Sequence, residues 1–220
     1  PPSKLVERAI KWGHKAIAIT DHGCVQGYPE ACNAADGKIK IIYGIEDYFI
    51  DDIKEPDKTY KELRSYHQII LVKNHIGLKN LYKLISKSNI DYFYKKPRMP
   101  KSEIMKHREG LIIGSACEAG ELYRAILEER PEQEIMEIAS FYDYLEIQPV
   151  GNNRFMIDAH SDPSAKNPDK NKEFDKITCI EDIENINRKV IAIADKLGKP
   201  VVATCDVHFI DPEDAKYRAI

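Results

Sequence analysis

The feature that most constrains the fold of this sequence is a short apolar run with a metal-capable side chain at one end. In Ala16–Gly23 an apolar run that is too short for a typical helix is followed by Thr20, Asp21 and His22, and then by glycine. Such a run predicts a buried parallel strand whose carboxyl end delivers a carboxylate and an imidazole into a cavity. Four further segments have the same pattern, one of them with its polar residue first: Ile39–Glu46, His67–Val72, Leu111–Cys117 and Val201–His208.

Strand-like runs alternate with amphipathic, helix-like segments, which predicts an α/β domain with a parallel sheet. Strands are expected at 16–20, 40–45 (continued by 47–50), 67–72, 111–114, 144–148 and 200–204. Helices are expected at 4–11, 26–36, 76–86, 101–107, 121–129, 131–141 and 181–197. An open sheet gathers its ligands at one switch point, whereas here nearly every predicted strand carries one. We therefore expect a closed or nearly closed barrel with its site at the strand ends.

Three stretches are expected to be irregular. Residues 51–62 are charged and contain Pro56, which indicates a surface connection. Residues 89–100 are dense in Tyr, Lys and Arg, and we expect a loop there. Residues 152–176 are rich in Ser, Asp, Pro, Asn and Lys, a composition that predicts a mobile loop.

Composition narrows the class of protein. At 220 residues and 43% hydrophobic content, the chain can bury a full core, which predicts one domain. The net charge of -3 gives no global attraction for nucleic acid, so any such role is local or belongs to a partner. No run approaches a membrane span, and no signal peptide is recognisable. Five widely spaced cysteines without a CxxC pair fit a reducing compartment, so we expect a cytoplasmic protein.

The polar residues at the strand ends combine imidazole, carboxylate and thiolate groups: Asp21, His22, Glu46, His67, Cys117, Asp206 and His208. This donor set suits zinc, manganese or iron better than calcium or magnesium alone. Carboxylates can bridge two ions, so the cluster could hold more than one. Paired ions would bind a phosphate and activate a water for phosphoester hydrolysis.

Each residue also has a structural explanation. The Asp-His-Gly sequence could be a turn with a helix cap, and Glu46 could be a surface charge. His67 could be a core histidine with its hydrogen bonds satisfied, and Cys117 a small buried hydrophobe. The pair Asp206 and His208 is the most specific signal, because residues two apart in an extended segment share one face.

The 89–101 segment interleaves basic and aromatic side chains, which could contact a phosphate or a nucleic-acid backbone. Arg98 is the candidate for a substrate phosphate. The alternative is a loop that covers the mouth of the barrel, with its aromatic rings packed down and its lysines in solvent.

Four motifs contain the candidate ligands: Ala-Ile-Thr-Asp-His-Gly (18–23), Tyr-Gly-Ile-Glu (43–46), Gly-Ser-Ala-Cys-Glu-Ala-Gly-Glu-Leu (114–122) and Asp-Val-His-Phe (206–209). Three more are Gly-Leu-Lys-Asn-Leu-Tyr-Lys-Leu (77–84), Tyr-Phe-Tyr-x-x-Pro-Arg-x-Pro (92–100) and Gly-Lys-Pro-Val-Val-Ala-Thr (198–204). Together they resemble the PHP (polymerase and histidinol phosphatase) domain. The likeness is specifically to that of the PolC-type DNA polymerase III alpha subunit of low-GC Gram-positive bacteria, over nearly the whole chain except 152–176.

The resemblance implies a distorted seven-stranded β/α (TIM-like) barrel over residues 1–220, with divalent metal ions (zinc, manganese or iron) at the strand ends. It assigns the metal ligands residue by residue: His22, Glu46, His67, Cys117, Asp206 and His208. Asp21 would then lie behind the ligands and orient them. No further catalytic residue is separable from this set, apart from Arg98 as a phosphate contact.

The sequence departs from the family pattern in three ways. The His-x-His strand that opens the family is not found before Pro1, so the first strand is expected to be missing or incomplete. PolC proteins carry an exonuclease that is inserted at the position corresponding to about 52–66 of this sequence. The exonuclease is absent here. No polymerase sequence follows Ile220, and the two ends suggest a fragment of a larger polypeptide. We therefore expect weak metal occupancy and little or no hydrolysis.

The resemblance implies a PHP domain of a DNA-directed DNA polymerase, a nucleotidyltransferase of bacterial replication. The isolated domain would be structural, or at most a metal-dependent phosphoesterase or pyrophosphatase. Its partners would be the rest of the polymerase chain and, through it, DNA and replisome subunits, with no membrane. Two alternatives stay open: a free-standing phosphoesterase resembling histidinol phosphatase, and a scaffold module with a vestigial site.

Overall fold

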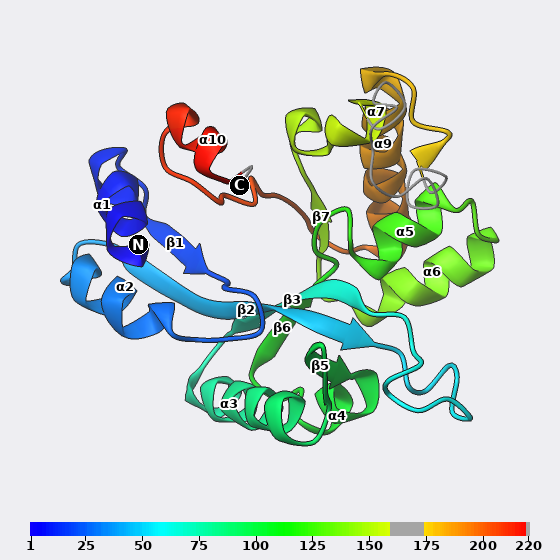
Figure 1. The fold of residues 1–220 in the computed structure, drawn as a ribbon, viewed down its shortest axis with the longest axis horizontal. Coiled ribbons are helices and arrows are strands. Elements are labelled where there is room, and N and C mark those ends of the chain that lie inside the picture. The colour runs from blue at the N-terminus through cyan, green and yellow to red at the C-terminus, as the bar shows by residue number, and fades with distance from the viewer. Residues whose placement is uncertain (159–173, 219–220) are drawn as a thin grey trace. The chain divides into compact units, whose positions relative to one another are not determined.

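The structure, a computed structural model, describes residues 1–158 and 174–218 (Figure 1). It divides the chain into two compact units, and each is described here by itself. The first unit consists of residues 1–112 and 207–220, and the second of residues 113–206.

Strand β2 (Lys40–Ile50) is the central element of the first unit. It pairs in parallel with β1 (Ala16–Ile19) and β5 (Lys96–Pro100), and antiparallel with β3 (Tyr66–Val72). The two-residue strand β4 (Phe93–Tyr94) forms a hairpin with β5. Beyond β3 the sheet continues to β6 (Leu111–Gly114), which runs across the boundary between the units.

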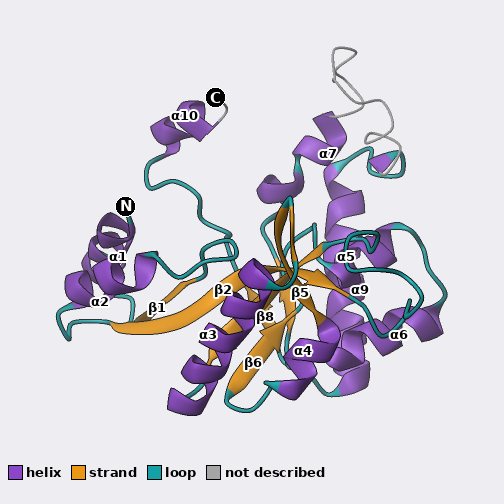
Figure 2. Cartoon of the chain, turned by 60° about the horizontal axis from the view of Figure 1, so that its bottom comes forward, coloured by secondary structure: helices purple, strands orange, loops and turns teal. Residues whose placement is uncertain are grey.

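Helices cover this sheet in two groups. Helices α1 (Pro2–Lys11) and α2 (Gly27–Ala35) pack against each other, and α2 also contacts β1 and β2. Helices α3 (His75–Ile90) and α4 (Lys101–Lys106) contact β5 (Figure 2). The unit ends in a short helical segment, η3 (Pro212–Asp214) and α10 (Ala215–Arg218).

Apolar periodicity explains why these helices lie where they do. In α1, Val6 and Ala9 are buried, whereas Arg8 and Lys11 are basic residues of the last turn. The two buried residues belong to one hydrophobic cluster with residues of neighbouring elements, among them Ile19, Ala31 and Ile39. Because each helix presents one apolar stripe, the sheet fixes which side of the helix faces inward.

The second unit is built on two parallel strands, β7 (Leu145–Ile147) and β8 (Val201–Ala203). Its helices are α5 (Glu121–Leu127), α6 (Glu132–Phe141), η1 (Val150–Asn153), α7 (Phe155–Asp158) and α9 (Ile180–Leu197). Helix α9 contacts β7 and buries Ile183, Ile186, Val190 and Ala194 on one side. It ends at Gly198, whose φ of 63° is the left-handed conformation that glycine adopts without steric cost.

The predicted α/β architecture is confirmed, but the sheet is not parallel throughout. β2 and β3 run antiparallel, with Phe49 opposite Tyr66. Residues 51–65 connect these two strands, and a connection of this length allows either direction, since a crossover between parallel strands takes a dozen or more residues. Among the described residues the strands form two separate sheets, so the closed barrel expected from the sequence is not seen there.

The loop predicted at 89–100 is also wrong in part, since it contains β4 and β5. β5 contains Pro97 and Pro100, whose backbone nitrogens cannot donate to a sheet ladder. Lys95 lies between the two strands with a φ of 61°, which allows the chain to reverse. β5 pairs with β2 over only three residue pairs, from Arg98 to Pro100.

The mobile loop predicted at 152–176 lies largely outside the described residues. Residues 152–153 belong to η1 and residues 155–158 to α7, and Phe174 is buried. Within the described part of the chain, no helix has both the length and the apolar content needed to cross a membrane.

Candidate metal centre

His22 follows β1 and is held beside Glu46 by the backbone. The two residues form an isolated parallel bridge that extends the pairing of β1 with β2. The Gly23 amide donates to the Glu46 carbonyl at 2.9 Å, and the Glu46 amide donates to the Asp21 carbonyl at 3.2 Å. The pairing of β1 with β2 therefore places His22 next to Glu46.

His67 reaches the same place because β3 is antiparallel to β2. In the sequence it precedes its apolar run, whereas the other candidates follow theirs. The antiparallel direction puts the start of β3 beside the later part of β2, where His67 is registered opposite Tyr48. His67 and Glu46 then lie on the same face of the sheet, two residue pairs apart along β2, with their side chains in contact.

The three side chains form a compact group. Glu46 Oε1 lies 2.7 Å from His67 Nδ1, and Glu46 Oε2 lies 3.6 Å from His22 Nε2. The rings of His22 and His67 meet edge to face, with their centroids 5.1 Å apart. Glu46 is buried, His67 is half-buried and His22 is exposed, so the group is open to solvent on the His22 side.

These residues fit a divalent transition metal. One donor atom from each of the three lies within 4.8 Å of the others. Two donors on a tetrahedral ion with bonds near 2.1 Å are about 3.4 Å apart, close to the separation of His22 from Glu46. Two imidazoles and a carboxylate are ligands of zinc, manganese and iron. The group can therefore hold a metal ion after small side-chain movements.

His208 lies near this group. Its ring centroid is 6.2 Å from that of His22, and both residues belong to the first unit. The chain returns to the first unit at residue 207. The structure thus brings four of the six predicted ligands, His22, Glu46, His67 and His208, into one neighbourhood.

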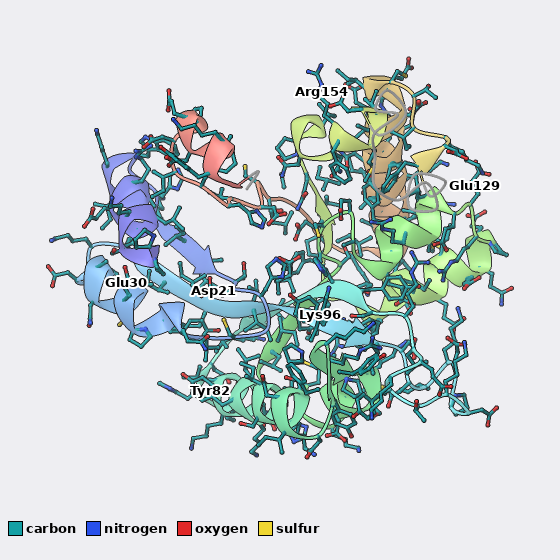
Figure 3. All side chains as sticks on the ribbon, viewed as in Figure 1. Asp21, Glu30, Tyr82, Lys96, Glu129 and Arg154 are labelled. Atoms are coloured by element: carbon teal, nitrogen blue, oxygen red, sulfur yellow. The ribbon has the colours of Figure 1, made fainter. Side chains whose placement is uncertain are left out.

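The remaining candidates are Cys117, Asp206 and Asp21. Cys117, which is buried, and Asp206, whose φ is 46°, both belong to the second unit. Their place among the ligands stays a prediction. The Asp21 carboxylate lies over Gly27 at the start of α2, where an added Cβ would be 2.5 Å from Oδ2 (Figure 3). Its orienting role at the site also stays a prediction.

Arg98 is engaged inside the first unit. Its Nη1 donates to the carbonyls of Tyr60 and Leu63, at 2.8 and 2.7 Å. The guanidinium also lies over the Tyr94 ring, 5.1 Å from the ring centroid. Burial lowers the pKa of Arg98 from its usual value. These contacts tie the 51–65 connection to β5, and a phosphate contact through Arg98 stays a prediction.

Tyr48 is the residue that the sequence did not single out. Its ring stacks on His22 with centroids 5.8 Å apart, and meets His67 edge to face at 5.7 Å. Burial raises the pKa of Tyr48, and the negative charge of Glu46 raises it further. Its position two residues after Glu46 on a strand was the signal, because residues two apart share a face.

The opposite face of β2 buries a second polar pair, Asp47 and Gln68. They are registered cross-strand partners with exposures of 1% and 0%. Among the described residues, no hydrogen-bond partner faces either carboxylate oxygen or the amide of Gln68. Burial raises the pKa of Asp47 well above its usual range, and the charge of Glu46 raises it further, while the Phe49 amide opposes the shift. Both of the raising effects favour the protonated form of Asp47 in the fold.

Comparison with known proteins identifies the family to which this sequence is similar. The family model of the PHP domain matches residues 1–158. A DNA polymerase III PolC-type from Clostridium perfringens is 48% identical over 80% of this chain and 12% of its own length. The corresponding proteins of Thermotoga maritima and Bacillus subtilis are 48% and 42% identical over 73% and 74% of this chain, and 10% of their own length.

One solved structure, of a metal-dependent phosphoesterase from Bifidobacterium adolescentis, aligns with 98% of this chain and 89% of its own at a TM-score of 0.47 and 13% identity. That score is too low to indicate a shared fold. The chain spans about a tenth of the length of the curated relatives named above.

Proposed function

This chain belongs to the PHP domain family, and from that premise we propose that it works as the PHP module of a PolC-type replicative DNA polymerase. The observation that supports this is its homology to segments of PolC-type DNA polymerase III, at 38–48% identity in the relatives compared. The polymerase activity would then belong to the larger chain, which would work in the cytoplasm. DNA and the other replisome subunits would be partners of that larger chain.

The module would bind a divalent metal through His22, Glu46 and His67, with His208 beside them. Cys117 and Asp206 would complete the set of ligands in a barrel of the PHP type. When bound, such an ion supplies a Lewis acid for a phosphate oxygen and lowers the pKa of a coordinated water. The side chains themselves support a phosphoesterase, because the exposed side of the group leaves room for a phosphate to approach.

Glu46 has the central structural role in this proposal. Its two carboxylate oxygens face different imidazoles, Oε1 toward His67 and Oε2 toward His22. A buried carboxylate placed in this way orients both rings before any ion arrives. Tyr48 stacks on one ring and abuts the other, so it limits their rotation.

Metal content tests the proposal. The purified chain is incubated with zinc or manganese, dialysed and analysed by mass spectrometry, in parallel with Glu46→Gln, His67→Ala and His208→Ala. We expect weak metal occupancy in the wild type, as the departure from the family pattern implies, and a further loss in each variant. His75→Ala is the matched control, because His75 is exposed at the start of α3. Equal metal in Glu46→Gln and wild type would contradict the site.

Hydrolysis of a model phosphodiester and of pyrophosphate by the metal-loaded chain separates the two possible roles of the module. Turnover that disappears in Glu46→Gln supports a phosphoesterase. Bound metal without turnover supports a structural role. A free-standing phosphoesterase is the second candidate, and it predicts a stop codon soon after residue 220 in place of polymerase sequence.

A further inference from the structure

The four basic side chains at 95–101 have different surroundings in the structure. Lys95 Nζ lies 5.4 Å from the centroid of Tyr94, and Lys101 forms a 2.6 Å salt bridge with Asp51. Arg98 donates to two backbone carbonyls. Lys96 Nζ lies 4.4 Å from the centroid of the Tyr48 ring, the ring that stacks on His22. Of the four, Lys96 is therefore the cation that adjoins the candidate metal centre.

Backbone geometry fixes Lys96 at this position. It pairs with Tyr94 across the β4–β5 hairpin, directly after the left-handed Lys95. Two residues later, Arg98 is registered opposite Tyr48 on β2. Since β2 and β5 are parallel, counting back two residues on each strand puts Lys96 level with Glu46 and on the same face.

A second contact holds the hairpin against the His22 turn. An added Cβ at Gly23 would lie 2.8 Å from Pro97 Cγ and 3.4 Å from Tyr48 Cε2. The proline ring therefore packs directly on the residue that follows His22. The strand register and this contact independently place the start of β5 beside the metal-binding face.

The ammonium group of Lys96 is available for an anion. The side chain is exposed, and it forms no salt bridge with any residue in the described ranges. A lysine above an aromatic face is attracted by the ring but keeps its three donors for another partner. Lysine is also a common phosphate binder, acting as a compact point charge on a flexible stem.

We propose that Lys96 binds a non-bridging oxygen of the phosphate group that approaches the His22–Glu46–His67 cluster, and that the Tyr48 ring holds its ammonium in place. This inference rests on the proposed function, because it needs a phosphate at that cluster. The substrate class would be a phosphate anion that keeps at least one oxygen free to contact Lys96 beside the metal-binding cluster. It replaces Arg98 with Lys96 as the first phosphate contact.

The test compares Lys96→Gln with Lys95→Gln by calorimetric titration of inorganic phosphate and of pyrophosphate. Both variants remove one positive charge from an exposed, adjacent position, so the comparison separates a specific contact from a general field. Titrations are made with and without zinc, and metal content and thermal unfolding are measured for each variant. We expect the affinity of Lys96→Gln to fall about tenfold and that of Lys95→Gln less than twofold, with equal metal content.

Lys96→Arg should keep most of the affinity, because it keeps the charge. Unchanged binding in Lys96→Gln, an equal loss in Lys95→Gln, or no phosphate binding by the wild type would each overturn the inference. Failure of the proposed function gives a different result, in which the wild type binds no metal. In that case a Lys96-dependent affinity for phosphate without metal would still support the contact.

Discussion

Gly23 combines two steric requirements at the edge of the metal-binding face. Its φ of 61° is the left-handed conformation, and its Cα faces the Pro97 ring. A side chain at this position therefore meets both backbone strain and a rigid neighbour. Glycine is the residue that satisfies both conditions.

We expect Gly23→Ala to destabilise the fold by about 2–4 kcal/mol, since left-handed strain and overpacking both contribute. Urea unfolding measures the loss. Gly13→Ala is the matched control, because Gly13 has a φ of 76° with open space where a Cβ would be added. That variant isolates the backbone contribution, expected near 1 kcal/mol. Equal losses in the two variants would show that the Pro97 contact has no effect on stability.

Asp47 illustrates the cost of a buried acid. Its folded-state pKa is raised, so the protonated form is favoured in the fold and the ionised form is favoured in the unfolded chain. Folding is therefore not penalised below the unfolded pKa, near 3.9. As the pH rises from there toward the folded pKa, stability is lost.

Asp47→Asn should stabilise the protein at pH 7 by about 1.4 kcal/mol for each unit of that pKa difference. The gain should shrink as the pH falls and vanish near pH 4. Unfolding curves at several pH values measure it, with the exposed Asp57→Asn as a control expected to change stability by at most about 0.5 kcal/mol. A stability gain that is independent of pH would mean that Asp47 is not protonated in the fold.

At the scale of elements, the β2–β3 connection is held by side chains of β5 and α4. Arg98 donates to two of its carbonyls, and Lys101 pairs with Asp51. Asp52 accepts from the Ser102 amide at 3.0 Å and from the Ser102 hydroxyl at 2.5 Å, at the start of α4. A segment that is irregular in sequence is thus attached at several points.

Arg98→Met should loosen this connection locally. Losing a charged donor to two carbonyls costs about 1.5–3 kcal/mol, and the effect should be concentrated at 60–64. Hydrogen exchange followed by mass spectrometry measures it as faster exchange in that peptide. Lys95→Met serves as the control, since Lys95 contacts only the ring of Tyr94 among the described side chains. Unchanged exchange at 60–64 in Arg98→Met would rule out Arg98 as the anchor.

At the scale of the whole molecule, a metal that binds the folded chain and not the unfolded chain must stabilise it. At a free metal concentration one hundred times the dissociation constant, the gain is about 2.7 kcal/mol. We expect zinc or manganese to raise the unfolding temperature of the wild type and of His75→Ala. Glu46→Gln should lose most of that increase, because it removes the buried carboxylate between the two imidazoles. An equal increase in Glu46→Gln would place the bound metal elsewhere.

The sequence by itself determined the elements and most of the chemistry of the site. Apolar periodicity located the central strand, the helices and the polar residues at their ends, because burial imposes a period on each element. His22, Glu46 and His67 were recognised as candidate ligands from residue type and position, and the structure brings them within contact. The family was also readable, because its motifs extend well beyond the ligands.

Tertiary structure decided strand direction, hairpin formation and the partners of the basic side chains. Periodicity is the same for parallel and antiparallel strands, so it could not reveal that β3 runs against β2 and thereby brings His67 to Glu46. Nor could it separate Arg98, which is held by carbonyls, from Lys96, which lies on the ring beside His22. Both differences depend on contacts between residues far apart in the chain, which only the folded backbone brings together.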